Sequence, residues 1–412
     1  DVIVGDYNYY FDGGAMLYAL TAANQWRVSV LVDEAHNLVA RGRAMYTAEL
    51  ARGALRAARA GAPAPLKKTL DRVGRSWTEL DQSAGAPYQV IAALPDKLLA
   101  SLQGAAGEIT DYLAEHPAPL EPALQRFYFD ALAFARLAES FGAHSLFDVA
   151  ADPAHGSTLC IRNIVPAPFL KARFAAAHSS ALFSATLSPW HYYSNALGMP
   201  ADTAWIDVES PFSADQLAVH VVKRISTRFQ HRAQSAAPIA DLIAAQYRAA
   251  PGNYLAFFSS FDYLEQVARR FTEQHPAIPA FSQSRRMDEA ERAAFLARFA
   301  ADNCGIGFAV LGGAFGEGID LPGARLIGAF IATLGLPQMN PVNEQVRLRM
   351  EATFGAGYDY TYLYPGMQKV VQAAGRVIRT AHDRGVVYLI DDRYAQPAVQ
   401  ALLPRWWGLD AA

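Results

Sequence analysis

Short apolar runs alternate with amphipathic stretches near both ends of the chain. Residues 28–32 read Val-Ser-Val-Leu-Val, and residues 2–4 form a second β-branched run. Apolar residues between positions 15 and 23 recur at helical spacing, so this region predicts a strand, a helix and a strand, the order of a βαβ unit. Further strands are predicted at residues 159–164, 181–183, 217–222, 254–258, 306–311, 325–331 and 386–390.

The segment 41–155 has a different character, because alanine, leucine and arginine dominate it and β-branched residues become rare. Its apolar positions, such as Leu124, Tyr128, Ala131 and Ala135, recur at helical spacing. We therefore expect an α/β protein with a mostly helical insertion. Its predicted domains are 1–40 with 156–200, the insertion 41–155, and a second α/β domain at 201–412.

Composition narrows the class of protein. A chain of 412 residues is too long for one core, and 52% hydrophobic with 18% charged residues is typical of a globular protein. The net charge of -3 excludes a uniformly basic surface but leaves room for a local basic groove. Cys160 and Cys304 are too few for a disulfide framework or a cysteine-ligated zinc or iron–sulfur site. No apolar run approaches the roughly 20 residues of a membrane span, so we expect no membrane segment and a cytoplasmic location.

Two carboxylates follow the strand at 28–32 directly. Asp33 and Glu34 are expected at the carboxyl edge of a parallel sheet, where ligands of open α/β folds bind. Asp33 has the hard oxygen ligands that Mg2+ prefers, and Glu34 can orient and deprotonate a water that attacks a phosphoryl group. The alternative is a strand followed by a solvated acidic turn.

A second candidate group lies towards the C-terminus. On a helix, Gln372, Arg376 and Arg379 share one face, and guanidinium groups there suit bidentate phosphate contact. The alternative is a surface helix with two solvated arginines, but Gly375 within it suggests close approach by another group. Between the two groups, a glycine-rich turn follows the strand at 306–311, and its candidate ligand-contacting residues are Gly316, Glu317, Gly318 and Asp320.

Ser184 and Thr186 follow the strand at 181–183. Their hydroxyls can link the acidic edge to bound nucleic acid, or they can cap the next helix, which is the commoner role. Trp406 and Trp407 offer rings for base stacking, although packing against the core is the commoner role of such a pair.

In this order, Asp33-Glu-Ala-His36, Ser184-Ala-Thr186, residues 313–320 and residues 372–379 resemble motifs II, III, V and VI of superfamily 2 helicases. Residues 6–10, 209–212 and 336–344 are similar, more narrowly, to the XPD and DinG group of iron–sulfur DNA helicases. The resemblance implies two RecA-like motor domains, the first incomplete and interrupted by a helical arch. ATP would bind between the motors, and single-stranded DNA would run across both.

The resemblance also implies roles for individual residues. Asp33 would hold Mg2+, Glu34 would activate water, and His36 would couple the site to motif III; local hydrogen bonding alone is the alternative for His36. The residues expected to reach the nucleotide phosphates are Gln372, Arg376 and Arg379. Those expected to link the nucleotide state to the grip on DNA are Gly316, Glu317, Gly318 and Asp320. Those expected to contact nucleic acid are Ser184, Thr186, Ser259 and Ser260.

The chain departs from the family in two features. It contains no GxxxxGK[ST] phosphate loop and none of the four cysteines of the [4Fe-4S] cluster, so both are expected only upstream of Asp1. We expect an ATP-dependent DNA helicase or translocase that acts on single strands or junctions in repair or replication. We expect it to be monomeric and to move 5′ to 3′. The fragment alone is expected to be inactive. The alternatives are a nucleic-acid-binding module with a vestigial motor and an RNA-remodelling DEAH protein.

Overall fold

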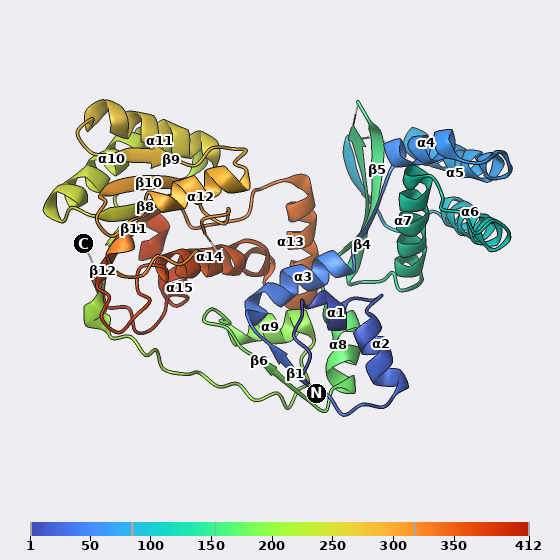
Figure 1. The fold of residues 1–412 in the computed structure, drawn as a ribbon, viewed down its shortest axis with the longest axis horizontal. Coiled ribbons are helices and arrows are strands. Elements are labelled where there is room, and N and C mark those ends of the chain that lie inside the picture. Colours follow the sequence, from blue (N-terminus) through green and yellow to red (C-terminus); the bar gives the residue numbers. More distant parts are fainter. Residues whose placement is uncertain (1, 84–85, 153, 317–318, 411–412) are drawn as a thin grey trace. The chain divides into compact units, whose positions relative to one another are not determined.

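The computed structural model of the chain divides into two compact units, residues 1–204 and 205–412 (Figure 1). The structure describes residues 2–83, 86–152, 154–316 and 319–410. Each unit combines helices with a parallel sheet, so the predicted α/β class is confirmed.

The second unit contains a seven-stranded sheet within its described residues, with the order β13-β7-β12-β11-β8-β10-β9. All paired neighbours are parallel. The strands are β7 (Leu217–Val222), β8 (Asn253–Phe258), β9 (Ala280–Ser282), β10 (Gly305–Val310), β11 (Gly328–Ala332), β12 (Gly385–Ile390) and β13 (Leu409–Asp410). The five strands predicted for this region are therefore confirmed.

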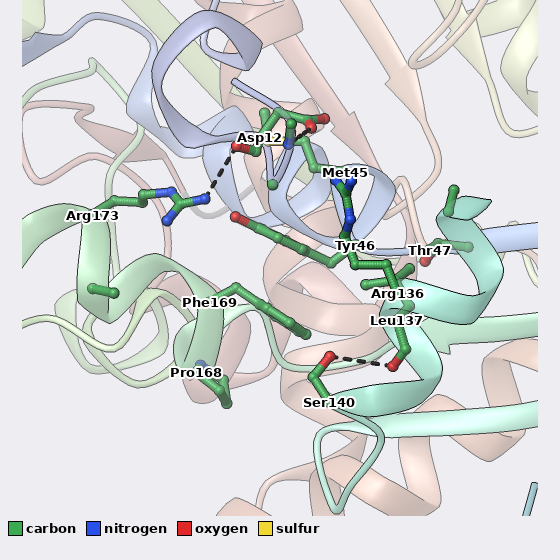
Figure 2. A pocket seen from close by; sticks show the side chains of 14 residues that line it. Asp12, Met45, Tyr46, Thr47, Arg136, Leu137, Ser140, Pro168, Phe169 and Arg173 are labelled. Atoms are coloured by element: carbon green, nitrogen blue, oxygen red, sulfur yellow. Dashed lines mark hydrogen bonds between the residues drawn. The ribbon is translucent and has the colours of Figure 1, made fainter. Parts of the chain in front are cut away.

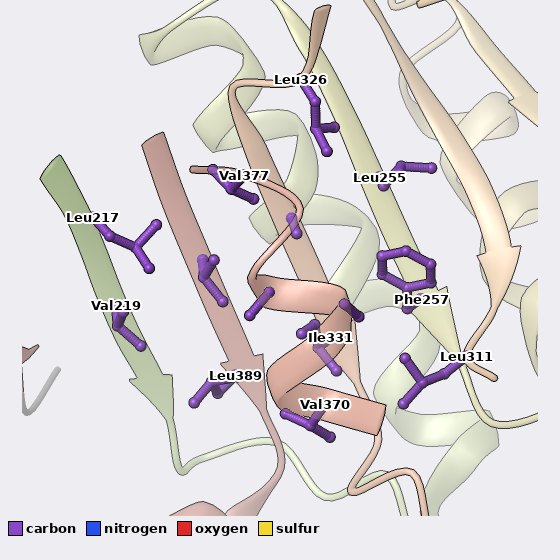
Figure 3. Close-up of a cluster of buried hydrophobic side chains, with 14 of the residues drawn as sticks. Leu217, Val219, Leu255, Phe257, Leu311, Leu326, Ile331, Val370, Val377 and Leu389 are labelled. Carbon is purple, nitrogen blue, oxygen red and sulfur yellow. The ribbon is translucent and has the colours of Figure 1, made fainter. Parts of the chain in front are cut away.

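Both faces of this sheet are covered by apolar side chains. Leu255 and Phe257 of β8 point into a cluster with Val370 of α14 (Tyr364–Ala374), as Figure 3 shows. The alternate β8 residues Tyr254 and Phe258 pack on the other face against α10 (Arg232–Ala249) and α11 (Phe261–Gln274). A parallel sheet buried on two faces explains why these strands read as continuous apolar runs. The remaining helices are α12 (Glu289–Ala297), α13 (Pro341–Phe354) and α15 (Pro397–Gln400).

The first unit contains a smaller parallel sheet. Among its described residues, β1 (Ser29–Val32) pairs with β6 (Ser179–Leu182) and with no other strand. The helices near these strands are α1 (Asn8–Phe11), α2 (Met16–Ala23), α3 (Leu38–Met45), α8 (Ala167–Ala176) and α9 (Trp190–Leu197). The strand predicted at residues 2–4 is wrong: Val2 and Val4 are 90% and 93% exposed, because an apolar run forms a strand only where a neighbouring strand pairs with it.

The segment between α3 and α8 contains the predicted helices, namely α4 (Arg52–Gly61), α5 (Ala64–Ser83), α6 (Asp96–Glu115) and α7 (Pro122–Glu139). It also contains an antiparallel sheet that the sequence analysis missed, formed by β2 (Ala48–Ala51), β5 (Gly156–Asn163), β4 (Ser145–Asp152) and β3 (Tyr88–Ile91). The strand assigned from sequence to the first motor domain, β5, pairs within this sheet. Its partner β2 is only four residues long and lies far away in sequence, so local patterning carries little signal for the pairing.

Candidate functional site

The acidic pair lies where the sequence places it, at the carboxyl end of β1. Parallel pairing continues past the strand, because the Phe183 amide donates to Val32 (3.0 Å) and the Ala35 amide donates back to Phe183 (3.1 Å). Asp33 and Glu34 are both exposed. The Glu34 backbone is left-handed, with φ 48° and ψ 41°, which costs a residue with a side chain roughly 1–2 kcal/mol. Such strain is common at functional sites.

Tyr7 braces this turn from the N-terminal segment. Its hydroxyl lies within hydrogen-bond distance of the Asp33 carbonyl and of the Glu34 carbonyl, the latter at 2.8 Å. Burial, with the nearby Glu34 and Asp33 carboxylates, raises the pKa of Tyr7 to about 12. The phenol therefore remains a donor at neutral pH. In the sequence, the only signal for this tyrosine is the family resemblance of residues 6–10.

His36 joins the acidic turn to the segment that follows β6. Its buried Nδ1 lies 2.6 Å from Ser184 Oγ and 3.2 Å from Glu34 Oε2, and Ser184 donates to the same Glu34 oxygen at 3.3 Å. A proton on Nδ1 fits all three contacts. His36 thus contacts one residue that is close in sequence, Glu34, and one that is distant, Ser184.

Ser184 also accepts a hydrogen bond from the Thr186 amide at 3.2 Å, which makes a tight turn. It does not cap α9, because that helix begins at Trp190 after Pro189 without a side-chain cap. Thr186 Oγ1 is buried, and it has no hydrogen-bond partner among the described residues. The capping alternative for this pair of hydroxyls is therefore wrong.

The glycine-rich turn of the second unit follows β10. A side chain at Gly316 would place its Cβ 2.9 Å from the Gly312 amide nitrogen, so the turn closes only with glycine at this position. Gly312 itself has a φ of +77°. Glu317 and Gly318 lie outside the described residues, and Asp320 carries an exposed carboxylate.

The structure corrects the predicted helix over residues 372–379. Helix α14 ends at Ala374, and Gly375 is its C-cap, so this glycine ends the helix and does not mark a close approach within it. Arg376 and Arg379 nevertheless converge, because both donate to the Ile319 carbonyl, at 2.9 and 3.1 Å. Arg379 Nε also lies 3.5 Å from Asp320 Oδ1. Gln372 lies in the last turn of the helix and is half-buried.

Asp383 holds the arginine segment in place. Its carboxylate accepts hydrogen bonds from the Arg379 and Thr380 amides (2.7 and 2.8 Å) and from the Thr380 hydroxyl (2.7 Å). Burial opposes ionisation, but these hydrogen bonds lower the pKa of Asp383 below its usual value. Sequence reasoning missed this residue, although a Thr followed three residues later by an acidic residue is a capping-box pattern.

Ser259 and Ser260 follow β8 at the same edge of the sheet. Ser260 caps α11 by accepting from the Tyr263 amide at 3.3 Å. Both hydroxyls accept from the guanidinium of Arg232, at 2.8 Å for Ser259 and 3.5 Å for Ser260.

A cavity of about 370 Å³ opens in the first unit between α7, α8 and the end of α3 (Figure 2). The Tyr46 ring stacks on Phe169 at 4.1 Å within its wall. Arg173 donates to the Asp12 carbonyl at 3.2 Å beside them. None of the predicted site residues lines this cavity. Four segments that are distant in sequence build it, so local sequence patterns gave no signal for it.

No group of three or more histidine, cysteine or acidic residues that could hold a metal occurs within the described ranges. A cation at Asp33 would therefore take its remaining ligands from water and a nucleotide, as Mg2+ commonly does. Cys160 is buried and Cys304 is exposed, each as a free thiol. No described helix is long and apolar enough to cross a bilayer.

Comparisons with known proteins give the site its context. Residues 243–409 match the family model described as the helicase C-terminal domain. The chain is 29% identical over 257 residues to regulator of telomere elongation helicase 1 from Bos taurus, covering 55% of this chain and 21% of the relative. It is 27% identical over 270 residues to ATP-dependent helicase DinG from Mycobacterium tuberculosis, covering 61% and 39%.

The fold is shared as well. The structure of S. tokodaii Xpd4 superposes with a TM-score of 0.65 at 14% identity, covering 98% of this chain and 81% of that one. The resemblance to the XPD and DinG group is thereby confirmed. The chain spans about a fifth to two fifths of the length of these curated relatives.

Proposed function

We propose that this chain is part of an ATP-dependent DNA helicase or translocase of the XPD and DinG group, which acts on single-stranded DNA and junctions in repair or replication. The observation that carries the proposal is the contact between Glu34, His36 and Ser184 at the carboxyl ends of two adjacent parallel strands. This contact joins the turn that contains Asp33 and Glu34 to residues 184–186, and so connects the segments that resemble motifs II and III.

In the first unit, Asp33 and Glu34 have different tasks. Asp33 would hold Mg2+, which when bound neutralises charge on the nucleotide phosphates. Its carboxylate is exposed and accepts the Glu34 amide at Oδ1 (2.7 Å), which leaves Oδ2 for that ion. Glu34 orients the attacking water and accepts its proton. His36 and Ser184 fix one Glu34 oxygen, which leaves the other free for the water.

In the second unit, Arg376 and Arg379 supply positive charge to the transferring phosphoryl group, with Gln372 beside them. Their shared contact with the Ile319 carbonyl ties them to the segment after the glycine-rich turn. Movement of either arginine towards a phosphate therefore releases that segment. Gly316, Glu317, Gly318 and Asp320 would in this way connect nucleotide state to DNA grip.

The rest of the proposal concerns the whole protein. ATP binding requires a phosphate loop, and the [4Fe-4S] cluster requires four cysteines. This chain contains no such loop and only two cysteines. We propose that upstream sequence supplies both, that the protein is a cytoplasmic monomer, that it carries a DEAH box at residues 33–36, and that it moves 5′ to 3′.

The test has two arms. The purified 412-residue chain should bind a labelled single-stranded oligonucleotide by fluorescence anisotropy, with DNA preferred over RNA, but should show no DNA-stimulated ATP turnover. In the protein with its upstream sequence, Glu34→Gln or Arg376→Ala should lower turnover by about 10³-fold or more. Robust turnover by the 412 residues alone, or full activity of both variants, would contradict the proposal.

A further inference from the structure

The edge of the second unit that carries Ser259 and Ser260 also presents an exposed aromatic ring. Phe229 opens a short turn, Phe229–His231, that leads directly into α10. Its side chain is 81% exposed, whereas Tyr254 of β8 and Tyr263 of α11 are buried. An exposed phenylalanine loses the free energy that burial would provide, so packing does not account for its presence.

Arg232 lies beside this ring, three residues further along. Its guanidinium is 5.3 Å from the centre of the Phe229 ring and 5.2 Å from that of Tyr263. The ring remains largely exposed despite this contact. The side chain therefore presents positive charge next to an open aromatic surface.

Arg232 differs from nearby arginines in its partners. Arg228 pairs with Asp392, and Arg285 pairs with Asp262. Among the described residues, no carboxylate lies within ion-pair distance of Arg232, which donates instead to the neutral hydroxyls of Ser259 and Ser260. Burial lowers the pKa of Arg232, but guanidinium remains charged at neutral pH. The guanidinium therefore has no directly paired carboxylate, although Asp262 is close enough to act on its charge.

The two serine hydroxyls have unused donors. In each contact described above, Ser259 and Ser260 accept a hydrogen bond, from Arg232 or from the Tyr263 amide. Their own protons can therefore be donated outwards. One guanidinium and two hydroxyls at the start of α11 match the acceptor oxygens of a phosphate group.

We propose that Phe229, Arg232, Ser259 and Ser260 bind one nucleotide of single-stranded DNA, with the base stacked on Phe229 and its phosphate held by Arg232 and the serines. This inference rests on the proposed function and adds a base-stacking contact to it. Stacking requires an unpaired base, because bases within a duplex already stack on their neighbours. The site therefore favours a single strand over a duplex.

The test measures the affinity of the 412-residue chain for a labelled oligo(dT) by fluorescence anisotropy. Phe229→Ala should weaken binding by about 5- to 100-fold, the usual range for loss of one stacked base. Phe229→Trp should retain the affinity and add a tryptophan signal that the oligonucleotide quenches. The matched control is Phe129→Ala in α7, a 56% exposed phenylalanine in the first unit, which should change the affinity little.

Salt dependence separates the two contacts. Arg232→Ala should reduce the slope of log affinity against log salt by about 0.7, because one fewer counterion is released from the single strand. Phe229→Ala should leave this slope unchanged. The unfolding curve of Phe229→Ala should coincide with that of wild type, since the ring is exposed.

The outcomes distinguish this inference from the proposed function. If wild type binds and Phe229→Ala binds no more weakly than Phe129→Ala, the stacking site is wrong while the helicase proposal stands. The same holds if Phe229→Trp shows no quenching beyond that of wild type. If wild type fails to bind any single strand, both proposals fall.

Discussion

In the second unit, seven parallel strands lie between two apolar clusters, whereas in the described part of the first unit β1 pairs only with β6 and Leu31 is 73% exposed. Both sheets nevertheless end in polar segments at their carboxyl edges. The segment with Arg376 and Arg379 packs on the core of the second unit through Val377 and Ile378, which are buried. The acidic turn rests instead on side-chain hydrogen bonds from Tyr7, His36 and Ser184.

This difference shows how the candidate residues of each unit are held in place. Where a core is complete, the site geometry depends on packing and on buried carboxylates. Where few strands are present, it depends on individual polar contacts between distant segments. Substitutions should therefore have large effects on the stability of the second unit and smaller, local effects in the first.

The largest effect is expected from Asp391→Ala at the end of β12. Asp391 is fully buried and accepts hydrogen bonds from Arg393 (2.6 and 3.0 Å) and from the Thr227 amide (2.9 Å). Removing it leaves Arg393 without its partner and should cost about 3–5 kcal/mol in the free energy of unfolding. Urea denaturation measures this loss. The control Asp392→Ala removes a more exposed pair with Arg228 and should cost less than about 1 kcal/mol.

The same carboxylate predicts a pH dependence. Burial opposes ionisation of Asp391, but hydrogen bonds and charge from Arg393 lower its pKa to about 2. Because this pKa lies below the unfolded value of about 4, the stabilisation is present above pH 4 and is lost as the pH falls towards 2. Unfolding curves between pH 5 and 2 should show a loss in wild type that is smaller in Asp391→Ala. Equal pH dependence of the two proteins would contradict this role.

A smaller effect is expected from His36→Ala in the first unit. The substitution removes the buried imidazole that links Glu34 to Ser184, and should cost about 1–3 kcal/mol. Hydrogen exchange should increase in the turns after β1 and β6 and remain unchanged in the second unit. His178→Ala, an exposed histidine that contacts Arg27, serves as the control. Uniform exchange across both units would show that the link is not local.

The backbone strain at Glu34 gives the next effect. Glu34→Gly and Glu34→Ala both remove the contacts with His36 and Ser184, but only glycine relieves the left-handed conformation. The glycine variant should therefore be more stable than the alanine variant by about 1 kcal/mol. Thermal unfolding compares the two. An alanine variant as stable as the glycine variant would contradict strain at this position.

The smallest effect is expected from Tyr7→Phe. Loss of the hydroxyl should cost about 1 kcal/mol or less, because Tyr7 is only half-buried. The raised pKa, about 12 against an ordinary value of about 10, means that the wild-type contribution is present below pH 10 and is lost as the pH rises towards 12. Ultraviolet titration of wild type against Tyr7→Phe detects the missing high-pH phenol. A difference spectrum that titrates near pH 10 would contradict the hydrogen bonds of the Tyr7 hydroxyl to this turn.

Sequence patterning alone determined five strands of the second unit, since a parallel sheet covered on both faces gives each strand a continuous apolar run. It did not predict the short strands β9 and β13 at the two ends of the sheet. Patterning also placed Asp33 and Glu34 directly after a strand, because the apolar run ends at Val32. It failed at residues 2–4, at the antiparallel sheet and beyond Ala374. In each case the outcome depends on a partner far away in sequence or on where a helix ends.

Only the tertiary structure decided which groups meet. His36 and Ser184 follow the two paired strands β1 and β6, and Arg232 reaches Ser259 because α10 begins beside the end of β8. Local sequence records the preference of each segment but not the long-range register between segments. That register is set by burial of apolar surface across the whole unit, which no short stretch of sequence contains.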